Sequence, residues 1–152
     1  MNEEHYQKIK RVLVKTAEVR TELFRKLGGT IDNRGSLGPP EVIIQLLSQL
    51  PGLCLPLWKE EFPEGGEYSD RVRLDLSGAD LADSWFMCWN YNGFPLTGAN
   101  FRAAKLERTK WAFVVMANAD LSHSDLRQSY MIKVFCPGAS FRLADLTDSV
   151  IN

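Results

Sequence analysis

An apolar residue recurs at every fifth position through the second half of the chain, and this period restricts the fold more than any other feature of the sequence. A helix repeats about every 3.6 residues and a strand about every two, so neither accounts for it. The period predicts a chain that turns a corner every five residues and keeps one series of side chains inside. That series, the expected core ladder, is Leu76, Leu81, Phe86, Tyr91, Leu96, Phe101, Leu106, Trp111, Met116, Leu121, Leu126, Met131, Cys136, Phe141, Leu146 and Ile151.

A second series of small or apolar residues stands two positions before each of these, and the charged side chains occupy the other three positions. Four corners would close one coil, and the similar stretches that begin at Gly78, Gly98, Asn118 and Gly138 would be the same side of successive coils. Parallel stacking of such coils predicts columns of inward side chains. The expected columns are Ala79/Ala99/Ala119/Ala139 and Leu81/Phe101/Leu121/Phe141.

The five-residue units, among them ADLAD, ANFRA, ADLSH and ADLTD, resemble the pentapeptide-repeat family, whose pattern is A(D/N)LXX. The resemblance covers residues 74–152. It implies a mainly β fold, a right-handed quadrilateral β-helix of about four coils, and a bacterial source. The first coil departs from the pattern, because Trp89 and Phe94 stand where the family prefers a small residue and Pro95 lacks an N–H donor. We expect local distortion there or cover from another element.

The segment 1–73 has a different character and is expected to form a helical region with a linker. Apolar residues at spacings of three and four predict a helix over about 2–27. A second helix is predicted over about 40–50, starting at Pro40 and stopped by Pro51. The following residues, up to Asp70, are too rich in proline and glycine for a regular element.

An open end of a coil stack exposes core side chains and unpaired strand groups, and terminal caps usually cover such ends. We therefore expect the helical region to cap the first coil. The expected contact residues are Trp85, Met87, Trp89 and Phe94. A separate domain with its own partner is the alternative.

The last coil ends at Ile151 with no capping sequence after it. Either this coil is left open or a second copy covers it. A homodimer through the C-terminal coil would be isologous, as soluble oligomers commonly are. The resemblance supports this arrangement, because some members of the family dimerise in that way.

Residues suited to catalysis are few, and we expect a protein that is not an enzyme and has no cofactor. His5 and His123 are far apart and have no partner at metal-ligand spacing. Cys136 belongs to the core ladder, and Cys88 is expected to point outward without a basic neighbour that would activate its thiol. No phosphate-binding glycine motif or serine nucleophile motif occurs.

The column expected from Asp80, Asn100 and Asp120 could bind a cation. Hydrogen bonding of these side chains to the nearby backbone is the better interpretation. We therefore predict no metal site.

Several apolar residues fall at outward positions of the later coils, on two adjacent faces, and clustered exposed apolar groups indicate a contact surface. Cover by the helical region or a dimer seam would explain them equally well. The possible partner surface is Phe113, Val115, Tyr130, Ile132 and Phe135, with Val150 nearby.

The sequence thus predicts a protein–protein interaction or scaffold module with an unidentified protein partner. A net charge of −1 gives no general reason to expect nucleic acid or an anionic membrane as a partner. The charged N-terminus and the unpaired cysteines favour a cytoplasmic location. The resemblance to the pentapeptide-repeat family also implies an alternative, a DNA-mimicking gyrase-binding protein of the quinolone-resistance type. Mimicry needs a strongly acidic coil stack, whereas residues 74–152 hold eight acidic and seven basic side chains.

Overall fold

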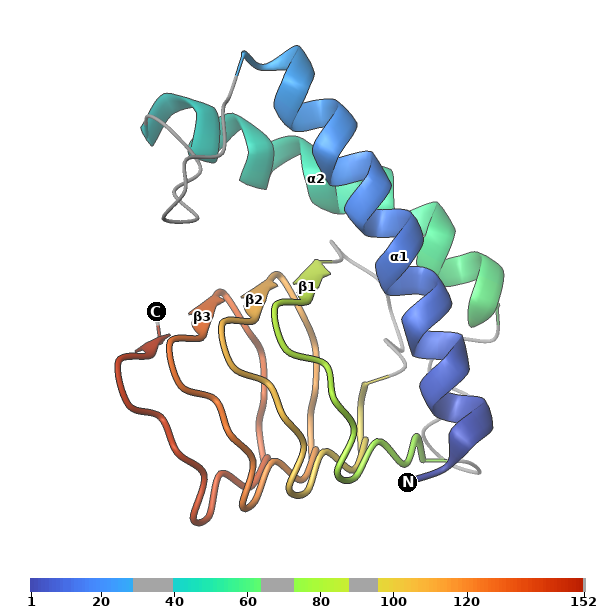
Figure 1. The fold of residues 1–152 in the computed structure, drawn as a ribbon, viewed down its shortest axis with the longest axis vertical. Coiled ribbons are helices and arrows are strands. Elements are labelled where there is room, and N and C mark those ends of the chain that lie inside the picture. The colour runs from blue at the N-terminus through green and yellow to red at the C-terminus, as the bar shows by residue number, and fades with distance from the viewer. Residues whose placement is uncertain (29–39, 64–72, 88–95, 152) are drawn as a thin grey trace.

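The computed structural model describes residues 1–28, 40–63, 73–87 and 96–151, and Figure 1 shows two long helices beside a stack of coils. The helices are α1 (Glu3–Lys26) and α2 (Pro40–Glu61). Four short strands follow: β1 (Trp85–Met87), β2 (Lys110–Ala112), β3 (Tyr130–Ile132) and β4 (Val150–Ile151). They form one parallel sheet in the order β1-β2-β3-β4. The described residues do not include four for which the sequence made predictions: Cys88, Trp89, Tyr91 and Phe94.

Helix α1 occupies almost the whole range predicted for it. Asn2 caps its N-terminus, because the Asn2 side chain accepts a hydrogen bond from the His5 N–H at 3.1 Å. Acidic residues stand in its first turn and basic residues in its last, which matches the helix dipole. Its buried stripe includes Ile9 and Val12, both 0 % exposed. The stripe faces α2 and the first coil.

Helix α2 does not stop at Pro51, so the prediction of a helix over 40–50 was too short. It runs through Pro51 and Pro56 to Glu61. Each proline removes one helical hydrogen bond, at about 3 kcal/mol in an isolated helix. Burying a large apolar side chain stabilises by about 1.5–3 kcal/mol. Five side chains at a spacing of four residues are all buried here, and the free energy of their burial exceeds the cost of the two prolines. They are Leu46, Leu50, Cys54, Trp58 and Phe62.

The two helices are antiparallel and are tied together at their exposed edges. The Arg11 guanidinium donates to both Glu61 carboxylate oxygens, at 2.9 and 3.2 Å, and the Lys15 ammonium lies 3.2 Å from Glu60. Beneath these ion pairs, the buried stripes of both helices belong to the same continuous apolar core as the coils. The helices and the coil stack are therefore parts of one packed unit.

Corners recur at every fifth residue of the coils wherever the structure describes them. The residue at each corner has a positive φ, in the left-handed region. Glycine holds this conformation without steric cost, whereas other residues lose about 1–2 kcal/mol. The corner residues are Gly78, Asp83, Gly98, Ala103, Arg108, Phe113, Asn118, His123, Gln128, Lys133, Gly138, Leu143 and Asp148.

The coils do not all have the predicted length of four five-residue units. β3 and β4 each follow the preceding strand by four units, as in the pairing of Trp111 with Met131. The first coil is one unit longer, because Phe86 pairs with Trp111 and Asp75 with Asn100. The Gly98 N–H donates to the Ala117 carbonyl, so the shorter spacing already applies there. The spacing between successive coils therefore changes from 25 residues at Met87 to 20 residues at Gly98.

The longer first coil corrects the predicted columns. Asp80 stacks on Lys105 and not on Asn100, and Asp75 begins the column that continues through Asn100. The inward residues of the first coil likewise stack on residues one five-residue unit further along the chain than predicted. The columns in the structure are Leu74/Ala99/Ala119/Ala139, Ala79/Ala104/Ser124/Ala144, Leu76/Phe101/Leu121/Phe141 and Leu81/Leu106/Leu126/Leu146.

The interior of the stack is filled by large side chains in contact. The rings of Phe86 and Trp111 are stacked with centroids 4.0 Å apart, and Phe101 meets both edge-on. The Trp111 indole N–H donates to the Thr109 hydroxyl at 2.7 Å. Cover is lost at the far end of the stack, where Ile151 is 61 % exposed. Ile151 keeps its predicted place in the ladder beside Met131, and its exposure agrees with the alternative that the last coil is left open.

Candidate interaction surface

Strand β3 places two residues of the possible partner surface on the outside of the stack. Side chains alternate along a strand, so Met131 points inward while Tyr130 and Ile132 point outward. Met131 is 2 % exposed, whereas its two neighbours are half-buried. Val150 follows Tyr130 in the same column and is 48 % exposed.

The other three residues lie at the corner that follows the strands and on the next side of the coil. Phe113 occupies a left-handed corner at φ 58°, and the Lys133 ammonium sits 5.6 Å from its ring centroid. Val115 and Phe135 pair across successive coils, where the Phe135 N–H donates to the Val114 carbonyl at 2.9 Å. Phe135 is 63 % exposed, and its backbone is nevertheless fixed by this ladder.

Two lysines give this apolar surface a positive character. Lys133 covers one side of Phe113, and Lys110 lies beside Tyr130 in the neighbouring strand. Lys110 is half-buried, and desolvation lowers the pKa of its ammonium, while the charge of Asp83 acts in the opposite direction. Asp83 is itself held by Arg108, in two hydrogen bonds of 2.7 and 3.0 Å.

A second group of contacts joins the N-terminal residues to the outer edge of the first coil. The Asn2 N–H donates to the Asp75 carbonyl at 3.0 Å, and the Asp75 N–H donates to His5 Nδ1 at 3.0 Å. The Tyr6 hydroxyl donates to the Asp80 carbonyl at 3.1 Å. Residues 2–6 thus occupy the place that a preceding coil would take.

The expected cap-contact residues Trp85 and Met87 lie in β1, which contacts both helices. The Arg20 guanidinium of α1 stands 4.4 Å from the Trp85 ring centroid, a cation–π geometry. Burial lowers the pKa of Arg20. Met87 is 2 % exposed.

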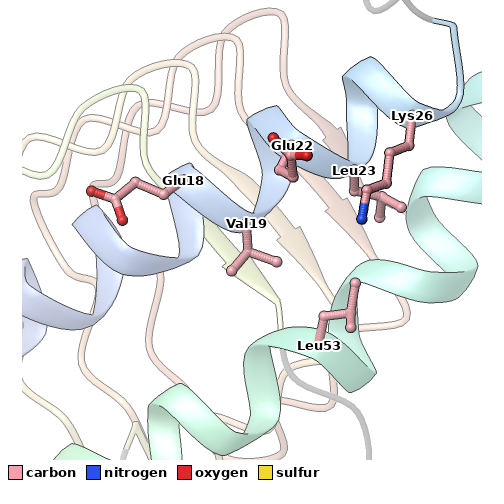
Figure 2. A pocket seen from close by; sticks show the side chains of 6 residues that line it. All are labelled: Glu18, Val19, Glu22, Leu23, Lys26 and Leu53. Carbon is pink, nitrogen blue, oxygen red and sulfur yellow. The ribbon is translucent and has the colours of Figure 1, made fainter.

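A shallow hollow between α1 and α2 was not expected from the sequence. Figure 2 shows Val19 and Leu53 facing each other across it, with Glu18, Glu22 and Lys26 around the rim. Its volume is about 480 Å³ and it is open to solvent. Leu53 was missed because the second helix was predicted to end before it. The buried stripe at every fourth residue from Leu46 to Phe62 was the signal that could have extended the helix.

The candidate chemical groups do not converge. His123 is exposed at a corner, His5 lies at the N-terminus of α1, and Cys136 is half-buried in the last described coils. Burial raises the pKa of the Cys54 thiol to about 12, so this thiol is protonated and unreactive at neutral pH. Within the described ranges, no cluster of three or more histidine, cysteine or acidic side chains could hold a metal ion.

The aspartate and asparagine side chains that precede the corners accept hydrogen bonds from the nearby backbone, which is the interpretation that the sequence favoured. Asp120 accepts from the Ser122 N–H at 2.9 Å, and Asn100 accepts from the Arg102 N–H at 2.9 Å. Hydrogen bonding lowers the pKa of Asp120, chiefly through the Ser122 side chain. These groups fix the corner that follows each of them.

The comparison with family models found a match to pentapeptide repeats, in eight copies over residues 96–131. The search of curated proteins found no match for this chain. Among the helices that the structure describes, neither is long and apolar enough to cross a membrane.

Proposed function

This chain carries pentapeptide repeats, and on that premise we propose that it is a non-enzymatic protein–protein interaction or scaffold module. The proposed architecture is a right-handed quadrilateral β-helix of about four coils over residues 74–152, capped by the N-terminal helical region. The recurrent corners and the parallel register of β1 to β4 support the coils. The hydrogen bonds from Asn2 and Tyr6 to the first coil support the cap.

The partner-binding site that we propose is the surface of Phe113, Val115, Tyr130, Ile132 and Phe135. The observation that carries this proposal is the exposure of Phe135, 63 %, at a position where the backbone N–H and carbonyl are both hydrogen-bonded to the preceding coil, at Val114 and Met116. A large apolar side chain on a rigid support loses little conformational entropy on binding. Aromatic residues of this kind are typical anchors of interfaces.

The charges around this surface favour a partner with apolar and acidic side chains. Lys110 and Lys133 supply the local positive charge, and the nearby Asp83 is already paired with Arg108. Complementary charge raises the association rate and orients the partner more than it raises affinity. The interaction should therefore weaken at high salt.

The test is capture of a partner from the source lysate by the wild-type protein and by the double variant Phe113→Asp, Phe135→Asp. Aspartate tolerates the left-handed backbone of position 113 better than phenylalanine does, so the variant should still fold. We expect a partner held by the wild type and lost by the double variant. Equal capture by both proteins, at equal circular dichroism and melting temperature, would exclude this surface.

Leu143→Asp provides a matched control for the added charge. Leu143 is 67 % exposed and sits at a corner with φ 59°, like Phe113, but on another corner of the coil. The control should retain the partner. If all three proteins remain monomeric and capture nothing, the proposed function fails. A concentration-dependent dimer would instead indicate that the homodimer through the C-terminal coil is the occupant.

The charge distribution of the coils gives little support to the gyrase-binding alternative. The Asp83 carboxylate is paired with Arg108, and the Asp125 carboxylate is 2.6 Å from the Arg127 guanidinium. An array of paired charges lacks the continuous negative field of a DNA duplex. A gyrase supercoiling assay separates the two functions, because a mimic inhibits supercoiling and a scaffold leaves it unchanged.

A further inference from the structure

The first coil and the last coil of the stack differ in how their edge groups are satisfied. Within the coils, Leu76 N–H donates to the Asn100 carbonyl and Asn100 N–H donates to the Leu74 carbonyl. The N–H and carbonyl of Asp75 point to the opposite side, where the preceding coil would stand. Asn2 N–H and His5 Nδ1 satisfy these two groups, each at 3.0 Å.

The His5 imidazole takes the place of a backbone carbonyl as the acceptor. Unlike a carbonyl, its Nδ1 loses the ability to accept a hydrogen bond when the ring is protonated. Nδ1 accepts a hydrogen bond only in the neutral ring with its proton on Nε2. Protonation places a second N–H against the Asp75 N–H at the same position. Two donors then face each other in a site where His5 is 9 % exposed.

We propose that His5 is a pH-sensitive latch, which holds the N-terminal end of α1 on the first coil when neutral and releases it when protonated. The latch is independent of the proposed partner surface, which lies on the later coils. It acts at one end of α1 only, since Ile9 and Val12 further along the helix are fully buried apolar residues that do not titrate.

The charges that face His5 come from both packed elements. Glu4 and the Asp75 carboxylate favour the protonated ring, whereas Lys8 opposes it. The Asp75 carboxylate is already engaged, because it accepts from the Ser77 N–H at 3.1 Å and the Ser77 hydroxyl at 2.7 Å, and the Met1 α-amino group lies 3.6 Å away. Desolvation is the largest effect, and it lowers the pKa of His5 below its ordinary value of 6.5.

The direction of the pH dependence follows from this. Because the folded state lowers the pKa of His5, the unfolded state binds more protons between that lowered value and 6.5. The stabilisation by His5 is therefore complete above 6.5 and is lost as the pH falls below it. The unfolding equilibrium constant should rise by up to about tenfold per pH unit in that window.

The first experiment is urea unfolding of the full chain between pH 7.5 and 5, for the wild type and for His5→Asn. Asparagine places an oxygen acceptor near the position of Nδ1 and does not titrate. We expect the wild type to lose stability on acidification and the variant to lose much less. The matched control is His123→Asn, which removes the second of the two histidines, at an exposed corner, and should keep the wild-type slope.

Nitrogen NMR of the wild-type ring provides a readout that does not depend on any variant folding. We expect the Nε2–H tautomer at pH 7 and a pKa below 6.5 for His5, with faster exchange of the Asp75 amide, relative to its intrinsic rate, below that pKa. A pKa of 6.5 or above overturns the proposal. An equal pH slope in wild type and His5→Asn also overturns it.

Discussion

The two ends of the coil stack carry the same inward sequence pattern, yet only one of them is buried. In the first coil, Leu76 and Leu81 are 0 % and 1 % exposed. In the last coil, the equivalent residues Phe141 and Leu146 are half-buried, and Ile151 is 61 % exposed. The difference arises because α1 and α2 cover the first coil, as Figure 1 shows, whereas no described element covers the last.

This contrast separates two contributions that a repeat protein usually combines. The five-residue pattern determines which side chains point inward, whereas the neighbouring coil or helix determines how much apolar surface each inward side chain loses to water. A repeat therefore stabilises the fold chiefly through its neighbours. The same leucine should have a different energetic value at each level of the stack.

The largest expected effect tests this idea with one substitution in one column. Leu126 is 0 % exposed between two coils, and Leu146 occupies the same column in the last coil. Leu126→Ala should destabilise the fold by about 2–5 kcal/mol, because it leaves a cavity. Leu146→Ala should cost less than half as much, as measured by urea unfolding. Equal losses of unfolding free energy would show that burial by a neighbouring coil does not determine how much a repeat stabilises the fold.

A second pair compares glycine corners at the two ends. Gly78 and Gly138 both have positive φ, so alanine at either should cost about 1–2 kcal/mol. The added methyl group meets open space at Gly78 but collides with the Asn118 side chain at Gly138. Gly138→Ala should therefore lower the melting temperature more than Gly78→Ala. The reverse order would mean that the first coil is the more tightly constrained end.

Removal of one hydrogen bond at the capped end should have a smaller effect. Tyr6→Phe deletes the donor to the Asp80 carbonyl and leaves the ring in place. We expect a loss of about 0.5–1.5 kcal/mol, the usual net value of one hydrogen bond. The amide of Leu81, which belongs to the same peptide group as the Asp80 carbonyl, should shift in the NMR spectrum, while amides of the last coil should not.

The smallest expected effect concerns the ion pair between the first two coils. Arg108→Gln removes the partner of Asp83, and Gln128 shows that glutamine fits the same corner one coil later. Both charged side chains are more than half exposed, so the loss should stay below about 1 kcal/mol. The loss should also decrease in high salt. A larger loss that is insensitive to salt would point to packing by the arginine stem.

Among the residues that the structure describes, the sequence alone was sufficient for the corners and for the direction of the inward series. Both depend on contacts within a few residues, such as the bond from the Asp120 carboxylate to the Ser122 N–H. The pattern was equally clear for the start and extent of α1, where Asn2 and the apolar spacing act locally.

Two features depend on contacts far apart in the sequence, and these the pattern did not predict. Shifting the first coil by one unit keeps every inward residue inward, so the pattern is the same for a coil of four units and for a coil of five. The pairing of Asp75 with Asn100 decides between them. Helix α2 continues past Pro51 because of a buried stripe that needs its tertiary partners. The local preference of proline alone would end the helix before Pro51.

The longer first coil also bears on how such a chain can change in length. An insertion shorter than one unit would shift the five-residue pattern in all later units and would move charged side chains into inward positions. An insertion of one whole unit preserves the alternation of inward and outward residues, because the inward residues Phe86 and Trp111 pair directly although they are five units apart. The number of residues in the coil stack should therefore change in multiples of five, and whole five-residue units are the appropriate step for engineering its length.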